Sequence, residues 1–186
     1  ASPARISPSS TACYATPKTH WDRDLARGRP FYYFAYGAAV SEAAIDTLTG
    51  ETRLLRVDVL HDCGKSLNPA IDLGQIEGGF VQGAGWLMTE ELVWDGEGRL
   101  KTHAPSTYKV PCASDRAPDM RVGIWEKGKN RELTVRRSKA AGEPPLMPAI
   151  SAHQAIGAAI ASVRQDFHHL DAPATPERVL FALGAP

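Results

Sequence analysis

The chain has 186 residues, and its 21 Lys and Arg side chains balance its 21 Asp and Glu side chains, so the formal net charge is zero. Apolar residues make up 43% and charged residues 23% of the sequence, which is typical of a folded globular domain and excludes an intrinsically disordered chain. A neutral chain has no overall basic field, so we expect neither nucleic acid nor a membrane as a partner. The longest nearly apolar run, residues 31–40, is also shorter than the ~20 apolar residues of a membrane-spanning helix.

The cysteines and the first residues bear on location. Cys13, Cys63 and Cys112 are odd in number and widely spaced, which favours reduced thiols in a reducing compartment over a disulfide framework. Residues 1–17 contain no Met, no basic cluster and no apolar core, so they do not form a signal peptide and are typical of a chain that is entered midway. We therefore expect a cytoplasmic protein.

Residues 1–30 are rich in Pro, Ser, Thr and Arg and show no sustained period, so we expect a loop or extended entry segment, followed by a domain over residues 31–186. The domain begins with two predicted strands, residues 31–46 and 52–61, joined by a turn at residues 47–50. In the second strand, apolar and charged residues alternate with the period of two that marks a half-buried strand.

A long helix is predicted over residues 69–90. Asn68 is a good N-cap residue, and Pro69 suits the first helical position. One apolar stripe follows at helical spacing: Leu73, Ile76, Phe80, Ala84 and Leu87. The segment also contains five glycines, at positions 74, 78, 79, 83 and 85, and each costs a helix about 1 kcal/mol relative to Ala. Such a cost indicates close approach of another backbone or of a ligand.

The second half of the sequence alternates between short strands and helices. We expect a hairpin over residues 93–100, strands over 120–124 and 133–137 joined by a polar turn, and a helix over 148–166. The predicted buried stripe of that helix is Ala152, Ile156, Ala159 and Val163. A short last helix starts at residue 175 and ends at Gly184. The sequence thus predicts an α+β fold in which hairpins pack against two longer helices.

Glu143 is the first candidate functional residue. It lies between Gly142, which permits unusual backbone angles, and two prolines, of which Pro144 biases Glu143 toward an extended conformation. A carboxylate held on a stiff loop suits a general base, because a base must lie within hydrogen-bond reach of its proton. On composition alone, a solvated loop glutamate is the more common case.

Gln75 is the second candidate. Its amide both donates and accepts hydrogen bonds, so it can bind a polar heterocycle. Gly78 and Gly79 lie on the same predicted helix and would let a flat ligand come close. The alternative is an ordinary glutamine on a helix surface.

Other patterns point away from further sites. Six basic residues could face an anionic cofactor group, although a solvated hairpin is the favoured interpretation: Lys127, Lys129, Arg131, Arg136, Arg137 and Lys139. The histidines show no pair with the spacing of a metal site, so we expect no metal held by protein ligands. The glycines of the long helix do not follow the G-x-G-x-x-G order, and no G-x-S-x-G motif occurs, which disfavours a dinucleotide fold and a serine hydrolase.

Four motifs then occur in a recognisable order, and their sequences are Phe31-Tyr-Tyr-Phe-Ala-Tyr-Gly37, Asp72-Leu-Gly-Gln-Ile-Glu-Gly-Gly-Phe-Val-Gln-Gly83, Pro105-Ser-Thr-Tyr-Lys109 and Gly142-Glu-Pro-Pro145. Together with the closing segment 172–177, they resemble the C-terminal part of the molybdenum-binding subunit in the xanthine dehydrogenase family of molybdenum hydroxylases. The similarity covers nearly the whole chain, and the long motifs are specific.

The resemblance implies the C-terminal portion of a molybdopterin-binding domain of the aldehyde oxidase/xanthine dehydrogenase type, with molybdenum held by the dithiolene of the molybdopterin cofactor. It implies oxidation of hypoxanthine and xanthine to xanthine and urate: a molybdenum-bound hydroxide attacks a purine carbon, and hydride passes to a molybdenum-bound sulfide. By the same resemblance, Glu143 is the general base that deprotonates the hydroxide, and Gln75 hydrogen-bonds the pterin. We then expect Glu143 to be buried beside the metal centre.

The resemblance also implies that the complete enzyme contains more than this chain. We expect [2Fe-2S] clusters and FAD elsewhere, a purine substrate, the remaining segment of the molybdenum subunit, and an iron–sulfur/FAD subunit within an oligomer. The chain alone is not expected to be active. Two alternatives stay open: a molybdenum hydroxylase for aldehydes or other N-heterocycles, and a non-catalytic fragment that only folds or binds a partner.

Overall fold

The computed structural model describes residues 9–184, and the chain divides into two units, residues 1–34 and 35–186, which are described separately. In the first unit, strands β1 (His20–Asp22) and β2 (Arg27–Arg29) form a small antiparallel hairpin. Asp22 accepts hydrogen bonds from the backbone N–H groups of Asp24 and Leu25 and so forms the turn. The loop or extended segment predicted over residues 1–30 therefore contains a hairpin, while residues 1–8 lie outside the described part.

The second unit contains a three-stranded sheet in the order β3-β4-β5. Strand β3 (Gly37–Ile45) pairs antiparallel with β4 (Thr52–His61), and β4 pairs parallel with β5 (Asp119–Ile124). Three predicted strands are thus confirmed, although the first begins at Gly37 rather than at residue 31. The predicted turn between β3 and β4 is held by Asp46, whose carboxylate accepts hydrogen bonds from two backbone N–H groups that follow it.

Helix α1 (Pro69–Met88) begins where the sequence predicts. The side chain of Asn68 accepts a hydrogen bond from the backbone N–H of Ile71 at 3.4 Å and so caps the helix. Leu73 of the predicted stripe is half-buried. The other four members are buried: Ile76, Phe80, Ala84 and Leu87. Three of them, Ile76, Phe80 and Ala84, pack with the inner residues of β4 in the main core.

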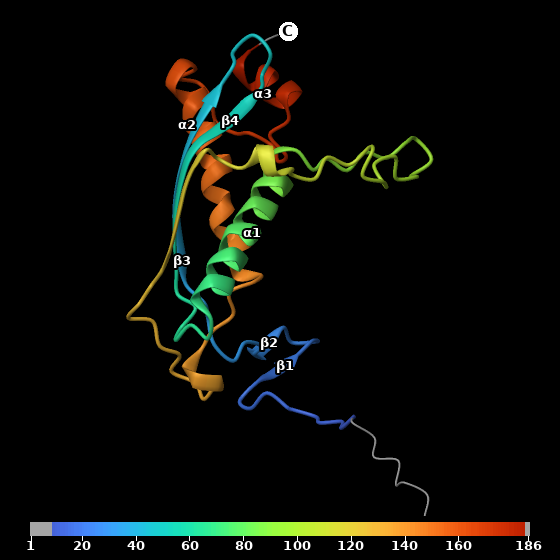
Figure 1. Cartoon of the computed structure of the whole chain (residues 1–186). Coiled ribbons are helices and arrows are strands. Elements are labelled where there is room, and N and C mark those ends of the chain that lie inside the picture. Colours follow the sequence, from blue (N-terminus) through green and yellow to red (C-terminus); the bar gives the residue numbers. More distant parts are fainter. Residues whose placement is uncertain (1–8, 185–186) are drawn as a thin grey trace, which may run out of the picture. The chain divides into compact units, whose positions relative to one another are not determined.

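Helix α2 (Ile150–Val163) follows directly on a 3₁₀ helix, η3 (Pro144–Ala149), and lies on the same side of the sheet as α1 (Figure 1). Its buried residues are Ala152, Ile156 and Ile160. The predicted stripe was wrong at Val163, whose side chain is 65% exposed because the helix ends at this residue. Ile156 and Ile160 instead form a second core cluster with α3 (Pro176–Leu183), which ends at the left-handed Gly184 as predicted.

Residues 144–163 form one continuous helical stretch that is long and apolar enough to cross a membrane, with a mean hydropathy of 1.3. This finding corrects the expectation, drawn from uninterrupted apolar runs, that no such segment exists. Mostly buried core helices meet the same criterion; here Ala149, Ala152, Ile156 and Ile160 are fully buried, but only 22% of the apolar window is. The stretch is therefore weak evidence for a membrane partner.

Two predicted elements of the second half differ in the structure. Residues 133–137 do not form a strand, because Arg136 and Arg137 have left-handed backbone angles, with φ of 50° and 64°. The predicted hairpin at residues 93–100 is reduced to a single bridge between Trp94 and Leu100. It lies in an extended arm, residues 90–110, that projects from the helices and the sheet of this unit (Figure 1).

Two glycines of α1 provide a matched test of this packing. A Cβ on Gly83 would lie 2.4 Å from the carbonyl oxygen of Leu146, whereas a Cβ on Gly78 would meet nothing within 4 Å. We expect Gly83→Ala to lower the free energy of unfolding by about 1–3 kcal/mol and Gly78→Ala to raise it by up to about 1 kcal/mol through helix propensity. Urea unfolding of the protein that carries this chain measures both. Equal effects of the two changes would contradict the packing described above.

Candidate functional site

The loop that carries Glu143 lies directly on helix α1. A Cβ on Gly79 would lie 2.9 Å from the carbonyl oxygen of Gly142 and 3.1 Å from Cβ of Pro145. With Gly83 facing Leu146, two turns of α1 thus receive the backbone of residues 142–146. The close approach that the glycines predicted is confirmed at these two positions.

Gln75 lies one turn before Gly79 on the same helix. Its side-chain oxygen Oε1 is 3.3 Å from the position that a Cβ on Gly142 would take. Because Gly142 directly precedes Glu143, the structure brings the amide of Gln75 and the loop of Glu143 to one place. The chemical roles of the two side chains stay predictions.

One expectation about Glu143 itself was wrong. Its backbone is helical, with φ of −82° and ψ of −40°, rather than extended. The reason is that Glu143 precedes η3 and its carbonyl oxygen accepts a hydrogen bond from the N–H of Leu146 at 3.0 Å. Glu143 is exposed among residues 9–184, and its expected burial beside the metal centre stays a prediction.

A short backbone ladder holds the segment before Glu143. The N–H of Lys139 donates to the carbonyl of Cys63 at 2.7 Å, and the N–H of Lys65 donates to the carbonyl of Arg137 at 3.1 Å. Between them, Gly64 forms an antiparallel bridge with Ser138. The segment is therefore fixed to the residues that directly follow β4.

A buried ion pair strengthens this junction. Nζ of Lys139 lies 2.5 Å from Oδ2 of Asp62, and the two side chains are only 7% and 15% exposed. The Lys139 ammonium also lies 4.9 Å from the ring centroid of Tyr36, within the range of a cation–π interaction. Sequence reasoning missed this pair because it assigned Lys139, with the surrounding basic run, to a solvated hairpin. A single acid directly after the alternating strand β4 was the available signal.

His61 adds a third contact to the same segment. It is 1% exposed, and its Nε2 lies 3.3 Å from the carbonyl oxygen of Ala140, to which it donates a hydrogen bond. Its Nδ1 has no hydrogen-bond partner among residues 9–184. Within the same range, no group of three or more His, Cys, Asp or Glu side chains gathers in a way that could hold a metal ion.

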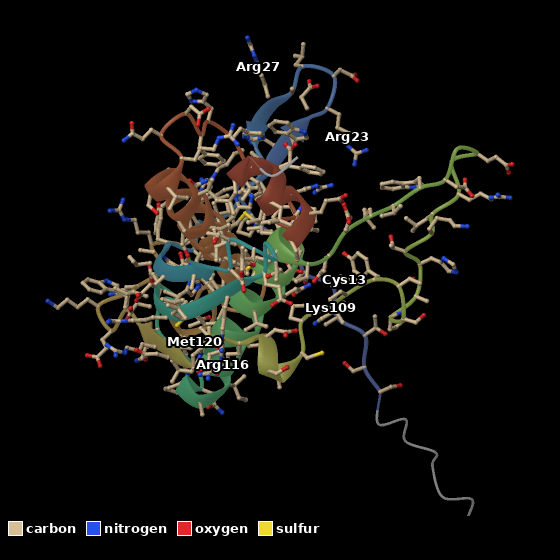
Figure 2. All side chains as sticks on the ribbon, turned by 90° about the horizontal axis from the view of Figure 1, so that it is seen from above. Cys13, Arg23, Arg27, Lys109, Arg116 and Met120 are labelled. Carbon is tan, nitrogen blue, oxygen red and sulfur yellow. The ribbon has the colours of Figure 1, made fainter. Side chains whose placement is uncertain are left out.

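Two hollows accompany the site. An open hollow of about 1040 Å³ lies beside the first turn of α1, and five basic side chains line it: Lys65, Lys127, Lys129, Arg136 and Arg137. A second cavity of about 40 Å³ lies near the other end of α1, where Arg116 and Met120 lie close together (Figure 2). That cavity is far smaller than the ~300 Å³ of a small ligand pocket, so it does not hold a substrate.

These observations place an exposed amide on a glycine-lined helix face, beside an exposed carboxylate on an anchored loop. The sequence profile of the family described as "Molybdopterin cofactor-binding domain" matches residues 1–117. The chain belongs to this family. The matched range includes Gln75, whereas Glu143 lies beyond it.

Similar proteins are larger oxidoreductases. Xanthine dehydrogenase/oxidase of Gallus gallus is 45% identical over 94% of this chain, which spans only 13% of that protein. The aldehyde oxidoreductase structure from Desulfovibrio gigas superposes with a TM-score of 0.70 at 30% identity. The superposition covers 90% of this chain and 17% of the aldehyde oxidoreductase chain. Quinoline 2-oxidoreductase from Pseudomonas putida 86 gives a TM-score of 0.67 at 30% identity, over 75% of this chain and 17% of its own.

The anchoring segment makes a prediction about thiol reactivity. Burial, followed by the nearby Asp72 carboxylate, raises the pKa of the Cys63 thiol above its ordinary value, so less of the reactive thiolate is present at a given pH. We expect Cys63 to resist iodoacetamide at pH 8 in the folded protein, while the exposed Cys112 reacts. Mass spectrometry of labelled peptides measures this. Equal labelling of the two cysteines before unfolding would show that the segment is open.

Proposed function

We propose that this chain is the C-terminal portion of the molybdenum-binding part of a xanthine dehydrogenase, which oxidises hypoxanthine to xanthine and xanthine to urate. The observation that carries the proposal is the meeting of Gln75 with the Gly142–Glu143 loop on the glycine face of α1. The substrate class is supported by the identity of 40–45% to several xanthine dehydrogenases over 94–96% of this chain.

The residues around Gln75 fit a flat, polar cofactor. Gly74 and Gly78 lie on either side of Gln75 in the sequence, and a Cβ at either glycine would meet nothing within 4 Å. The helix surface there is open to close approach by a ring. The exposed amide offers both donors and an acceptor, as a pterin edge requires. We therefore assign Gln75 to hold the pterin of molybdopterin.

The bound cofactor would supply the oxygen that is transferred to the substrate and would accept two electrons. Glu143 would act as the general base, its carboxylate oxygen accepting the proton that the attacking hydroxyl group loses. The loop anchored on α1 and after β4 keeps the backbone of Glu143 in a fixed place, which helps to bring its carboxylate within hydrogen-bond distance of a proton donor.

The exposure of Glu143 supports the proposal that this chain works inside a longer protein. A base functions best where water is excluded, and the chain spans only 13–14% of the curated relatives it matches. We propose that another segment of the molybdenum subunit covers Glu143. [2Fe-2S] clusters and FAD in further domains or subunits would carry the electrons away, within a cytoplasmic oligomer.

A second candidate function is the oxidation of aldehydes or of other N-heterocycles. The aldehyde and quinoline oxidoreductase structures, each at 30% identity, favour it over unrelated reactions. Turnover of the complete protein with xanthine, an aromatic aldehyde and quinoline distinguishes the two functions. A non-catalytic fragment is the third possibility, and it would contain no molybdenum after purification.

Glu143→Gln tests the proposed base. The change keeps size and polarity but removes the proton-accepting carboxylate, so we expect kcat with xanthine to fall at least about a hundredfold, within the range for general-base catalysis. Molybdenum content should stay at the wild-type level. Glu126→Gln, at another exposed glutamate, is the matched control and should leave kcat unchanged. Normal turnover by Glu143→Gln would overturn the assigned role.

Gln75→Ala tests the cofactor contact. Loss of the amide removes hydrogen bonds to the pterin, so the purified protein should contain less molybdenum and pterin than the wild type, by about tenfold if one good hydrogen bond is lost. Gln82→Ala, at an exposed glutamine on the same helix, should keep full cofactor content. Metal analysis and pterin fluorescence measure the outcome. Equal content in the two variants would exclude Gln75 from the cofactor site.

A further inference from the structure

We propose that Lys139, held by Asp62, is a positioning residue that sets the place of the Glu143 carboxylate. Lys139 precedes Glu143 by four residues, and we assign it no contact with substrate or cofactor. The inference rests on the proposed function only for the role of Glu143. The anchoring of the loop stands on the contacts of residues 36–65 and 137–146 alone.

Asp62 is the fixed side of the pair. Its backbone N–H donates to the carbonyl of Tyr36 at 2.8 Å, and its side-chain oxygen Oδ1 accepts a hydrogen bond from the N–H of Gly64 at 2.8 Å. The carboxylate therefore has one orientation at the end of β4. Its second oxygen, Oδ2, is left to receive the ammonium of Lys139.

Lys139 is held at both its backbone and its side chain. Its N–H donates to the carbonyl of Cys63, while its ammonium lies between the carboxylate of Asp62 and the ring of Tyr36. At 7% exposure, this ammonium has almost no access to water, so losing its partner would leave a buried charge uncompensated. The next residue, Ala140, is fixed by His61. The loop thus has a strong attachment point after β4.

The other attachment point lies on helix α1. The carbonyl of Gly142 and the ring of Pro145 lie against Gly79, so the chain from Ala140 to Gly142 spans two fixed points. Ala141, between them, is buried at 9% exposure. Glu143 directly follows Gly142, the point at which the loop contacts α1. A shift of the attachment at Lys139 therefore passes to Glu143 through only a few peptide units.

A buried ion pair is weak evidence for stability by itself, because desolvation offsets much of the attraction. A fixed geometry is what such a pair supplies here, since a directional carboxylate and a cation–π contact together allow one position of the ammonium. Misplacement of a catalytic group by about 1 Å can cost about a hundredfold in rate. A positioning role thus predicts a loss of kcat without a loss of fold.

The test is Lys139→Met in the complete enzyme that contains this chain. Met keeps most of the apolar stem and removes the charge. We expect kcat to fall ten- to a hundredfold, with KM and molybdenum content within twofold of the wild type. Hydrogen exchange of residues 137–146 should become at least tenfold faster, while residues 37–60 keep their protection. Lys101→Met, the same change at an exposed lysine outside the basic hollow, is the control and should change neither.

Two further variants make the result decisive. If Lys139→Met does not fold, Asp62→Asn removes the other charge and should show the same local exchange and kcat loss. If Lys139 acts through Glu143, Lys139→Met should cost much less in a Glu143→Asp background, where the carboxylate is already displaced, than in the wild type. Additive losses, unchanged exchange in residues 137–146, or faster exchange throughout the chain would each overturn the inference.

These outcomes separate this inference from the proposed function. If Glu143→Gln keeps normal turnover, the role of Glu143 fails while the exchange experiment still decides whether Lys139 anchors the loop. If Glu143→Gln is inactive and Lys139→Met is normal in both rate and exchange, only the positioning role fails.

Discussion

The contact between the glycine face of α1 and the backbone of residues 142–146 is the constraint on which the rest of the site depends. Side chains at Gly79 or Gly83 would occupy the space of main-chain carbonyls, so only a helix without Cβ atoms there can carry this loop. The helix accepts lower intrinsic stability for this approach and recovers it through the apolar stripe packed against β4. One helix therefore serves as a core element on one face and as a platform on the other.

Two different kinds of contact hold the loop of residues 139–146 in place. On α1 the contacts are steric and apolar, whereas at the end of β4 they are backbone hydrogen bonds and a buried ion pair. Steric contacts set how closely the loop can approach, and directional contacts set its position along the strand end. The chain belongs to the molybdopterin cofactor-binding domain family. This arrangement is consistent with that family, because a pterin needs an open surface with fixed polar groups around it.

Much of this arrangement could be predicted from local sequence. The cap at Asn68, the apolar stripe of α1 and the alternation in β4 each follow from short-range rules, and the structure confirms them. The failures are non-local. Left-handed angles at Arg136 and Arg137 replace a predicted strand, and the pairing of Asp62 with Lys139 joins residues 77 positions apart. Glu143 is exposed among the described residues, and a segment outside this chain, as we propose for its cover, could not be predicted from a pattern within it.

The parallel pairing of β4 and β5 has a consequence for how this chain can vary. Both strands end at the same edge of the sheet, where the N–H of Trp125 donates to the carbonyl of His61 at 2.8 Å. Near that edge, the carbonyl of Arg137 accepts a hydrogen bond from the N–H of Lys65. The segment between Trp125 and Arg137 is thus a loop whose two ends are both anchored at the end of β4. Insertions or deletions at its exposed residues, away from the buried Asn130, would change the outer surface and leave the spacing of the two ends intact. This segment is where related proteins can vary without changing the loop that carries Glu143.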